Sequence, residues 1–590
     1  MLIDARTLPE ETIFEHDICI IGAGAAGITL ALEFSNQPYQ VCLLESGGLE
    51  YDRLTQSLYA GENVGFPHFP LNTCRARYVG GSTNLWGGTS RPLDEIDFAD
   101  RPWMPYSGWA FNKAELDPYY ERAQKICGLG AYKYEFADWE EELKQLQRFN
   151  LPLPSDRLVT YIFQVMSCSN LRFGEVYRTQ IEQSPNIKTY IQANVVDIKT
   201  NDSTQAVTRL CVSTLEGKKF WIAAKVFVLA CGGLENPRLL LVSNKAQSNG
   251  LGNQHDLVGR FYMEHPYLRS GKVLLNKPNA LYPTDQKHKL EVDRSRIMAT
   301  LALSRAVQER EQVLNFSTRL VPVFPEWLKA FGRIRDGKWH SKETVNNYLS
   351  LINDLSLVAS NFNGAIARAW VKQKYKTPPF PDRLFETHLI SEQAPNPDSR
   401  ITLSSERDRL GLNRIKLDWR LSPIDKYTIT RSQQIIGEEL ERSKLGKLKI
   451  EFNGDESAWE SLEERSQQVI DAQAAAFDDS KLKVRLHEDS YWQTLRGSYH
   501  HMGTTRMSTN PRLGVVNEHC QVHGIYNLYI AGSSVFPTGG ISNPTLTIVA
   551  LAARLADKIK SQMGGTAGVL KFDPNFAQLD INTQPLQKAS

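Results

Sequence analysis

Residues 16–48 read HDICIIGAGAAGITLALEFSNQPYQVCLLESGG, and this stretch decides the fold. The apolar run 18–21 has the length of a buried strand, and the glycine-rich turn 22–27 separates it from a helical run. A second apolar run, 41–44, ends at Glu45. The order of strand, glycine turn, helix and strand predicts a βαβ unit that binds a dinucleotide, and it disfavours the alternative of a glycine turn without a ligand.

In the G-x-G-x-x-G spacing, each glycine of the turn has a separate structural role. Gly22 permits the tight turn, Gly24 lets a pyrophosphate approach the backbone, and Gly27 lets helix and strand pack closely. Ala25 and Ala26 follow Gly24 at the start of the helix, whose free N–H groups attract phosphates. Glu45 stands about 20 residues after the first glycine, where an acid binds ribose hydroxyls and would repel the 2′-phosphate of NADP.

Length and composition describe a large globular protein. The chain has 590 residues, 41% of them hydrophobic, and a formal net charge of +2. This length predicts two domains. No basic block stands out, so nothing supports nucleic-acid binding. The eight cysteines are scattered without a C-x-x-C pair, which predicts neither a disulfide framework nor a metal site.

The N-terminus and the hydropathy pattern bear on location. MLIDARTLPEETIFEHD lacks a basic region followed by an apolar stretch, so we expect no signal peptide. No apolar run reaches about 18 residues, so we expect no spanning helix. The expected location is cytoplasmic, although export in the folded state with a partner subunit would leave no trace in this sequence.

Further segments suggest how the remainder is organised. The loop 75–88, RARYVGGSTNLWGG, suits a backbone that passes close to a flat ligand. We expect a helix over 113–147, strands over 187–214, and a strand over 219–230 that leads into a second glycine turn and helix. The strand-like and hairpin-like segments of 385–420 predict the sheet of a second domain. Residues 325–375 predict an amphipathic helical insertion, with a membrane-surface or partner-binding patch as the alternative.

Two late segments carry residues suited to chemistry. Residues 497–507 read GSYHHMGTTRM, and residues 524–550 read GIYNLYIAGSSVFPTGGISNPTLTIVA. Asn543 is expected to cap the helix that runs from Thr545 onward, with Pro544 at its first position, and to aim its amide at whatever lies in front. His500 and His501 are adjacent, so we expect that they cannot both face one pocket. The residues alone do not decide between them.

These segments together resemble the glucose–methanol–choline (GMC) family of FAD-dependent oxidoreductases. The resemblance covers nearly the whole chain and rests on GAGAAG with Glu45, on VGGSTNLWGG (79–88), VLACGGLENPRLL (228–240) and VGRFYMEHP (258–266), and on the two late segments. The loop and the NPTLT segment look nearer to the sugar oxidase and bacterial dehydrogenase branch. The resemblance implies oxidation of a CH–OH group, expected to belong to a sugar, glycoside or polyol, by hydride transfer to flavin N5.

The resemblance also implies residue roles. His500 matches the base that stands three residues before the glycine of the Gly-Thr pair, and Asn543 matches the second active-site residue. Val195 or Val196 lies in a strand like the one whose backbone holds the adenine. Residues 82–86 contain no histidine, so the implied FAD is non-covalent. The remaining residues expected to bind the cofactor are Gly80, Gly81, Ser82, Asn84, Gly532, Asn543, Pro544 and Thr545.

The sequence thus predicts an α/β fold in which two domains are interleaved. A Rossmann-like FAD-binding domain is expected over 1–270 and 487–562, and an α+β substrate-binding domain built on an antiparallel sheet over 271–486. The tail 563–590 is expected to wrap loosely. Oxygen or another electron acceptor would reoxidise the flavin. The alternatives are a non-oxidative flavin lyase or isomerase, and a flavin subunit that docks a membrane or an electron-transfer partner through 325–375.

Overall fold

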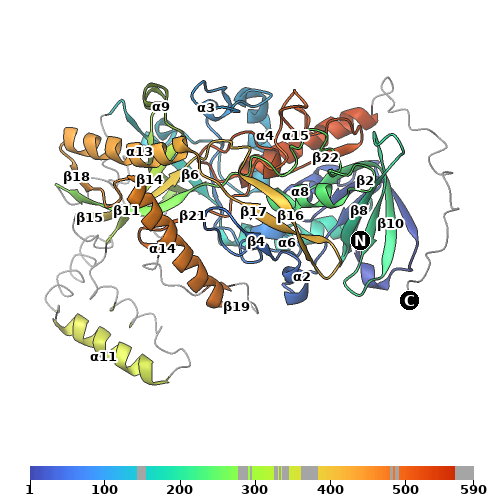
Figure 1. The fold of residues 1–590 in the computed structure, drawn as a ribbon, viewed down its shortest axis with the longest axis horizontal. Coiled ribbons are helices and arrows are strands. Elements are labelled where there is room, and N and C mark those ends of the chain that lie inside the picture. The colour runs from blue at the N-terminus through green and yellow to red at the C-terminus, as the bar shows by residue number, and fades with distance from the viewer. Residues whose placement is uncertain are drawn as a thin grey trace.

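A computed structural model of the chain describes residues 1–141, 155–276, 290–292, 295–323, 330, 334, 344–360, 383–478, 483–484 and 491–564. In Figure 1 an eight-stranded sheet lies at the right and a nine-stranded sheet at the left, with a three-stranded sheet between them. The mixed α/β architecture that the sequence predicts is therefore confirmed.

The eight-stranded sheet is built around the predicted βαβ unit. Its strand order is β1-β7-β3-β2-β10-β9-β8, with β22 paired to β10. All the pairs from β1 to β10 and the pair with β22 are parallel, whereas β9 and β8 continue the sheet antiparallel. The strands are β1 (Leu2–Asp4), β2 (Ile13–Ile21), β3 (Val41–Leu44), β7 (Ile187–Ile191), β8 (Asn194–Thr200), β9 (Val207–Ser213), β10 (Lys219–Leu229) and β22 (Leu528–Ile530).

The central strands of this sheet are apolar because both of their faces are covered. Residues 18–21 and 41–44 are at most 4% exposed, as expected for parallel strands between helical layers. Helix α1 (Ala25–Phe34) follows β2 and packs against the C-terminal helix α15 (Thr545–Gly564), which in turn packs against α4 (Lys113–Ile126). A hydrogen bond of 2.8 Å joins the Tyr120 hydroxyl to Thr547 Oγ1 across that last contact. The two ends of the described chain thus share one layer.

The nine-stranded sheet is antiparallel throughout, with the order β18-β11-β15-β14-β13-β6-β5, while β12 pairs with β13 and β21 with β11. Helices α13 (Pro423–Arg442) and α14 (Glu456–Ala475) pack against it. The strands are β5 (Thr89–Ser90), β6 (Leu158–Val165), β11 (Tyr267–Leu275), β12 (Leu290–Val292), β13 (Ser295–Leu303), β14 (Phe316–Pro322), β15 (Leu384–Ser391), β18 (Gly446–Lys449) and β21 (Leu495–Arg496).

Two sequence predictions need correction. The helix expected over 113–147 ends at Ile126, because Gly128 adopts a φ of +59° and the chain turns into the short 3-10 helix Phe136–Trp139. The segment 385–420 does not form one sheet. Strand β15 enters the nine-stranded sheet, whereas β16 (Arg400–Arg407) and β17 (Asn413–Asp418) form a separate three-stranded sheet with β4 (Gly61–Asn63).

The domain limits 1–270, 271–486 and 487–562 stay predictions. Strands β5 and β6 precede residue 270 but belong to the nine-stranded sheet, so the chain passes between the two large sheets more often than those limits imply. The remaining described elements are α2 (Arg53–Ser57), α3 (Glu95–Phe98), α6 (Phe173–Val176), α7 (Arg178–Gln183), α8 (Gly232–Val242), α9 (Arg305–Glu311), β19 (Phe477–Asp478) and β20 (Lys483–Val484).

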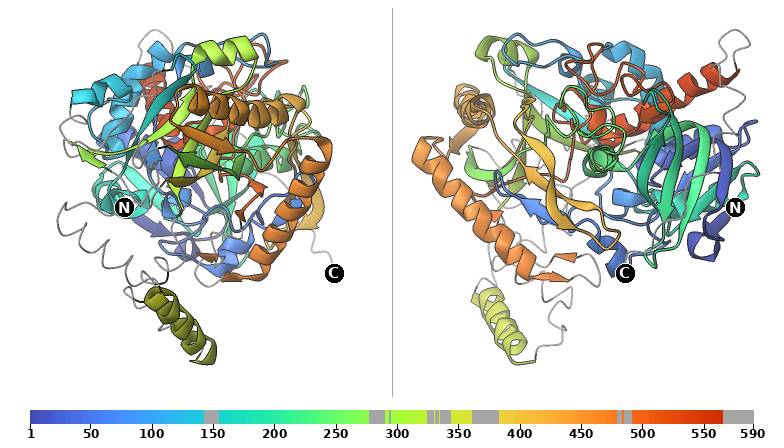
Figure 2. Two further views of the ribbon diagram at one scale, coloured as in Figure 1. Left: turned by 90° about the vertical axis from the view of Figure 1, so that its left-hand side faces the viewer. Right: turned by 45° about the vertical axis from the view of Figure 1, so that its right-hand side comes forward.

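The predicted insertion 325–375 is described chiefly as helix α11 (Thr344–Ser360), and most of its other residues lie outside the described part. Both views in Figure 2 place α11 away from the rest of the chain. Of the predicted tail, 563 and 564 end α15 and the remainder lies outside the described residues. Docking by the insertion stays a prediction.

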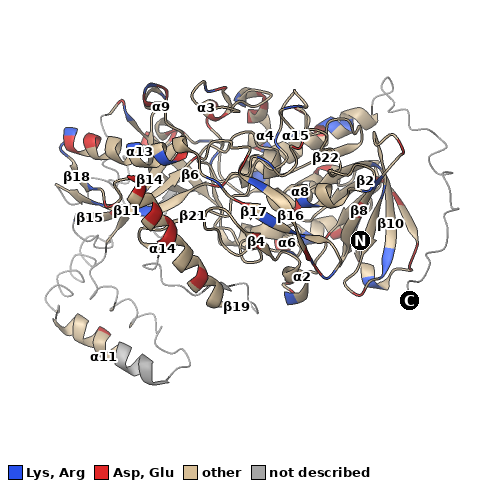
Figure 3. Ribbon diagram, viewed as in Figure 1, with Lys and Arg blue, Asp and Glu red and all other residues tan. Residues whose placement is uncertain are grey.

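In Figure 3 charged positions of both signs alternate along α13, whereas the charged positions of α14 are mostly acidic. In the described part of the chain, no helix combines the length and apolar composition that crossing a membrane requires.

Candidate active site

A cavity of about 650 Å³ lies where the two large sheets meet. Its wall combines the first glycine turn, the loop after residue 80, the turn between β10 and α8, the histidine segment, the start of α15 and several strands of the nine-stranded sheet. Of the residues that the sequence singled out, the wall includes Gly22, Gly24, Ala25, Ala26, Glu45, Gly81, Ser82, Val195, His500, Gly532, Asn543, Pro544 and Thr545.

The first glycine turn is shaped by steric limits. Gly22 has a φ of +105°, and a Cβ there would lie 2.6 Å from the Ala230 carbonyl oxygen. A Cβ on Gly27 would lie 1.8 Å from the Gly22 carbonyl oxygen, so Gly27 permits helix–strand packing and lies outside the cavity wall. A Cβ on Gly24 would come no nearer than 4.0 Å to its surroundings and would enter the cavity.

Glu45 is fixed at the end of β3. Its side chain accepts hydrogen bonds from the backbone N–H groups of Ala23 and Gly47, each at 2.9 Å. The residue is 5% exposed and contributes to the cavity wall. These bonds place the carboxylate beside the glycine turn, where an acid can meet ribose hydroxyls.

The loop 79–88 combines residues on the cavity with residues that hold its shape. Gly81 and Ser82 belong to the 3-10 helix Gly81–Asn84 and line the cavity. Gly80 and Asn84 do not. Gly80 has a φ of +98°, and the Asn84 amide donates a 3.0 Å hydrogen bond to the Val79 carbonyl. These two residues shape the loop behind the wall.

The second glycine turn joins the β10–α8 connection to the histidine segment. Gly232 has a φ of +83°, and a Cβ on it would meet nothing within 4 Å. A Cβ on Gly233 would lie 2.3 Å from the His501 carbonyl oxygen. Only a glycine at 233 therefore lets the histidine segment lie this close to α8. Of the two valines named for the adenine, Val195 lines the cavity and Val196 does not.

Helix α15 starts one residue later than predicted. Ile548 donates its backbone N–H to the Pro544 carbonyl at 2.8 Å, so Pro544 occupies the N-cap position and Asn543 precedes it. The expectation that Asn543 is the cap is wrong. Asn543 is half-buried, lines the cavity, and makes no hydrogen bond through its amide to any residue that the structure describes. That amide remains available to a ligand.

His500 and His501 both contribute atoms to the cavity wall, and the expectation that their side chains cannot both face one pocket stays a prediction. Their rings nevertheless diverge. His500 Nδ1 lies 2.9 Å from His265 Nδ1, whereas His501 Nε2 lies 3.5 Å from Glu264 Oε1. Burial, followed by the nearby His265, lowers the pKa of His500 to about 3. Burial also lowers the pKa of His501 to about 3.

The hydrogen-bond contacts of His265 determine which ring nitrogen of His500 carries the proton. His265 is fully buried, and its Nε2 lies 3.3 Å from the Gly539 carbonyl oxygen, which can only accept. His265 Nε2 therefore carries a proton, and burial keeps the ring neutral by lowering its pKa. Its Nδ1 is then an acceptor, so His500 Nδ1 donates to it. The lone pair of neutral His500 is left on Nε2.

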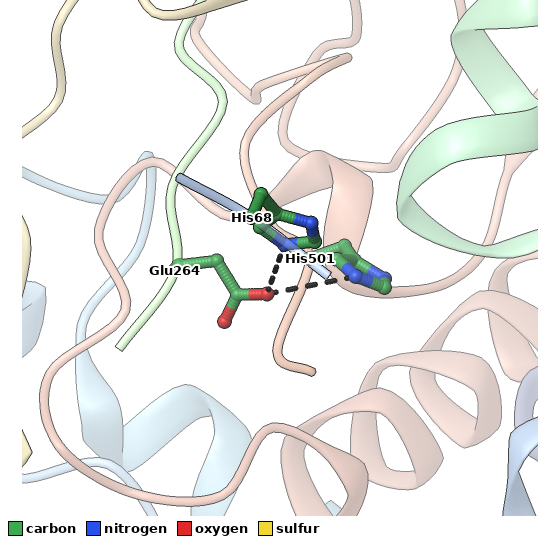
Figure 4. Close-up of side chains that lie close together, drawn as sticks. All are labelled: His68, Glu264 and His501. Atoms are coloured by element: carbon green, nitrogen blue, oxygen red, sulfur yellow. Dashed lines mark hydrogen bonds and ion pairs between the residues drawn. The ribbon is translucent and has the colours of Figure 1, made fainter. Parts of the chain in front are cut away.

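Glu264 ties the histidine segment to the loop before β11. Its Oε2 accepts backbone N–H groups from Ser498 at 3.0 Å and His500 at 2.9 Å. Its Oε1 lies 3.4 Å from His68 Nε2, as Figure 4 shows together with the contact to His501. Burial alone would raise the pKa of this carboxyl, but the contact with His68 and the neighbouring histidines lower it to about 2.

His68, Glu264 and His501 are also the described residues with the geometry to hold a metal ion, since one ligand atom from each lies within 4.8 Å of the others. The Tyr262 hydroxyl lies 3.1 Å from His68 Nε2. His68 Nδ1 lies 2.9 Å from the Phe69 carbonyl oxygen, so it carries the proton and leaves Nε2 able to accept from that hydroxyl. Hydrogen bonds therefore account for His68 and Glu264, whereas His501 Nε2 has no hydrogen-bond partner among the described residues. The expectation of no metal stays a prediction.

The segment VGRFYMEHP contributes to the family resemblance, but the sequence alone assigns no role to Glu264 or His265. It also assigns nothing in the strands of the nine-stranded sheet that form the wall opposite the glycine turns. No periodic signal marks these residues, because only the pairing of distant strands brings them together. They are Phe163, Tyr267, Met298, Thr300, Ser317, Arg319, Ile390 and Arg496.

Comparisons with known proteins identify an oxidoreductase that acts on CH–OH groups. Residues 395–552 match the family described as GMC oxidoreductase. Paromamine 6′-oxidase of Streptomyces fradiae is 25% identical over 93% of this chain and 92% of its own. The fructose dehydrogenase large subunit of Gluconobacter japonicus is 21% identical over 93% and 98%. Residues 395–552 therefore carry the GMC oxidoreductase domain, and the two relatives match nearly the whole chain.

A solved structure supports the fold. The crystal structure of formate oxidase superposes with a TM-score of 0.53, covers 94% of this chain and 100% of its own, and is 17% identical. GMC oxidoreductases bind FAD. The wall fits such a group, because Gly24 and Gly232 leave open the space that a Cβ would fill.

Proposed function

We propose that the protein oxidises a CH–OH group of a sugar, glycoside or polyol, with His500 as the base and FAD bound non-covalently along the cavity. The observation that carries the proposal is the neutral His500 beside the cavity, with its Nε2 lone pair free. Two relatives whose names refer to paromamine and fructose support a sugar-like substrate.

Different residues of the cavity wall would bind different parts of FAD. Glu45 would hold the ribose hydroxyls, the turn at Gly22 and Gly24 would receive the pyrophosphate, and Val195 would lie against the adenine. Ser82, Gly532 and the start of α15 would face the isoalloxazine end, where a helix N-terminus favours negative charge. Because residues 82–86 contain no histidine, we expect no covalent link through this loop.

FAD, when bound, supplies the acceptor for the hydride that leaves the carbinol carbon. The chain's own residues manage the proton and the geometry. His500 Nε2 accepts the hydroxyl proton, because a neutral imidazole is suited to this task near neutral pH. The Asn543 amide donates to the same oxygen and orients the carbon. His265 Nδ1 accepts a hydrogen bond from the Nδ1–H group of His500 both before and after the proton transfer.

An anaerobic reduction experiment tests the proposal. The yellow holoenzyme is mixed with a panel of sugars, glycosides and polyols in a stopped-flow instrument, and bleaching of the flavin is recorded. His500→Ala should retain FAD and slow bleaching by about 10²–10⁴-fold, the usual contribution of a general base. His16→Ala removes another buried histidine, on β2, and serves as the matched control.

Bleaching at the wild-type rate in His500→Ala would overturn the assignment of the base. Conversion of a substrate without any bleaching would favour the lyase or isomerase alternative. Admitting air after reduction, and timing the return of the yellow colour, separates an oxidase from a dehydrogenase that needs another acceptor.

A further inference from the structure

The cavity wall contributed by the nine-stranded sheet carries two arginines without acidic partners. Arg319 lies on β14 and Arg496 on β21, and both line the cavity. The other charged side chains of the wall have acidic or backbone partners. Arg77 and Arg238 pair with Glu235 at 3.1 and 3.2 Å, and Arg238 pairs with Asp408 at 2.6 Å, while Glu45 accepts backbone N–H groups.

Strand register explains why these residues face the cavity together. Arg496 pairs with Tyr267, Tyr267 with Ile390, and Ile390 with Ser317, so four neighbouring strands contribute one row. All four residues of this row line the cavity. Arg319 follows Ser317 by two positions on β14 and therefore points to the same face of the sheet. We call these two arginines the arginine pair.

The tyrosine between them brings the two cationic groups close. The guanidinium of Arg496 lies 4.7 Å from the centroid of the Tyr267 ring, and that of Arg319 lies 5.8 Å from the same centroid. Arg319 Nη2 also reaches the Tyr267 hydroxyl at 3.4 Å. The two guanidinium groups therefore lie at most about 10.5 Å apart, beside the same ring.

Stacking on aromatic rings does not satisfy the N–H donors of these arginines. A guanidinium has five donors and no acceptor. The Nε atoms of both arginines are buried without a hydrogen-bond partner. Across the described ranges of the chain, Arg496 has no hydrogen bond or ion pair through its guanidinium, and Arg319 has only its contact with the Tyr267 hydroxyl. An anion that enters the cavity would accept charge-assisted hydrogen bonds from these donors.

The arginine pair lies within reach of the proposed chemistry. Ser498, Tyr499 and His500 follow Arg496 along the cavity wall. Four residues of extended chain span at most about 14 Å, which is comparable with the length of a monosaccharide that carries an acidic substituent. A substrate can thus present its CH–OH group to His500 while its other end meets the arginines.

We infer that the substrate is anionic, a sugar acid or a sugar phosphate, and that Arg319 and Arg496 bind its carboxylate or phosphate. This inference rests on the proposed function for the identity of the reacting group. Arginine suits the task because its planar fork matches both anions in a bidentate way.

The test compares matched compounds and matched variants. D-Glucuronate, D-glucose 6-phosphate and D-glucose share one ring and differ in charge, and each is mixed anaerobically with the holoenzyme. We expect the two anions to bleach the flavin with a higher kcat/KM than D-glucose, and the better of the two shows whether carboxylate or phosphate is preferred. Arg319→Met and Arg496→Met should each raise KM for the preferred anion by about 10- to 100-fold without changing kcat.

The matched control is Arg209→Met. Arg209 also stacks on an aromatic ring, with its guanidinium 4.3 Å from the Trp221 centroid, but it lies on β9 away from the cavity wall. This variant should keep the wild-type KM for every compound. The FAD content and the flavin spectrum of all three variants should match the wild type, because the arginines are assigned to the substrate and not to the cofactor.

Equilibrium binding separates failure of this inference from failure of the proposed function. Inorganic phosphate, acetate and D-glucuronate are titrated calorimetrically into the wild-type holoenzyme and into the Arg319→Met/Arg496→Met double variant. Binding by the wild type that the double variant loses supports the inference even if His500→Ala contradicts the proposed base. Equal binding in both proteins, no binding in either, or a preference for D-glucose over both anions overturns it.

Discussion

The Nδ1 atoms of His265 and His500 lie 2.9 Å apart although 235 positions separate the two residues in the chain. One of these nitrogens must donate and the other must accept, and the contact of His265 Nε2 with the Gly539 carbonyl decides which. His265 is therefore a positioning residue. It fixes the tautomer of His500 without touching the substrate.

The first prediction tests that positioning role through substitutions at 265. In His265→Asn the Oδ1 atom can stand where Nδ1 stood and accept the same proton, so the rate of flavin reduction should stay within about 10-fold of the wild type. His265→Leu offers no acceptor and should lose about 10²-fold, at the lower end of what a general base contributes. Stopped-flow reduction at saturating substrate measures both.

The pH–rate profile of His265→Asp measures an effect that a change in packing alone would not produce. Its carboxylate would stabilise the protonated form of His500, so the acid limb of the pH–rate profile should shift upward from its wild-type position. Glu264 and His501 also influence His500, and neither is changed in these variants. Identical pH profiles in all three variants would reduce His265 to a space-filling role.

The second prediction concerns stability in acid. Burial lowers the pKa of several histidines from 6.5, and four of them move furthest: to about 4 for His16 and His388, and to about 3 for His500 and His501. Below pH 6.5 the unfolded chain therefore binds protons that the folded chain does not, and stability falls as the pH falls through this window. Glu264, with its pKa lowered from 4.5 to about 2, adds a loss of the same sign below pH 4.5.

Two buried carboxyls act in the opposite direction. Burial raises the pKa of Asp97 to about 8 and that of Asp425 to about 6, so each favours the folded state more as the pH falls toward 3.8. Four histidines outweigh two carboxyls, and the free energy of unfolding should fall by about 1.4 kcal/mol per pH unit for each net proton. Thermal unfolding of the holoenzyme between pH 6.5 and 5 measures the slope, and a flat or rising Tm would contradict it.

The sequence could predict the βαβ unit because its signals are local. The apolar runs, the glycine spacing and the acid at position 45 all fall within about 30 consecutive residues, and each follows from the geometry of one strand or one turn. The start of α15 was predicted within one residue for the same reason, since Pro544 marks it.

The wall opposite that unit could not be predicted because it depends on pairing between distant strands. Strand β5 has two residues and β21 has two, too few to show alternation. The row from Arg496 to Ser317 exists only through the registers of four strands. The contact between His265 and His500 likewise arises from tertiary packing, although the quoted motif VGRFYMEHP contained the partner.

The third prediction uses the asymmetric surroundings of Glu264. In Glu264→Gln the amide oxygen can replace Oε2 and accept the N–H groups of Ser498 and His500, while the NH₂ group can donate to His68 Nε2. This variant should fold. Glu264→Leu leaves buried donors unsatisfied and should lose about 3 kcal/mol or more. Urea unfolding of both variants measures the difference, and equal stability would show that these bonds contribute nothing.

The fourth prediction concerns the same cluster as a candidate ion site. Because His68 and Glu264 already have hydrogen-bond partners, we expect flavin reduction and Tm to be unchanged after dialysis against EDTA. Metal analysis of the holoenzyme should find less than one equivalent of any transition metal. A stoichiometric metal that EDTA removes together with stability would instead assign these three side chains as ligands.

The fifth prediction separates two glycines of the opening turn by what surrounds them. Gly24→Ala places a Cβ in the cavity, with no atom nearer than 4.0 Å, so the protein should fold and bind FAD more weakly. Gly27→Ala places a Cβ 1.8 Å from the Gly22 carbonyl oxygen and should prevent helix and strand from packing.

Gly437→Ala is the control, since its nearest neighbour would be 3.5 Å away in a helix that gains from the substitution. FAD content after gel filtration and far-UV circular dichroism distinguish the outcomes. Loss of FAD without loss of fold in Gly27→Ala would show that its glycine serves the ligand and not the packing.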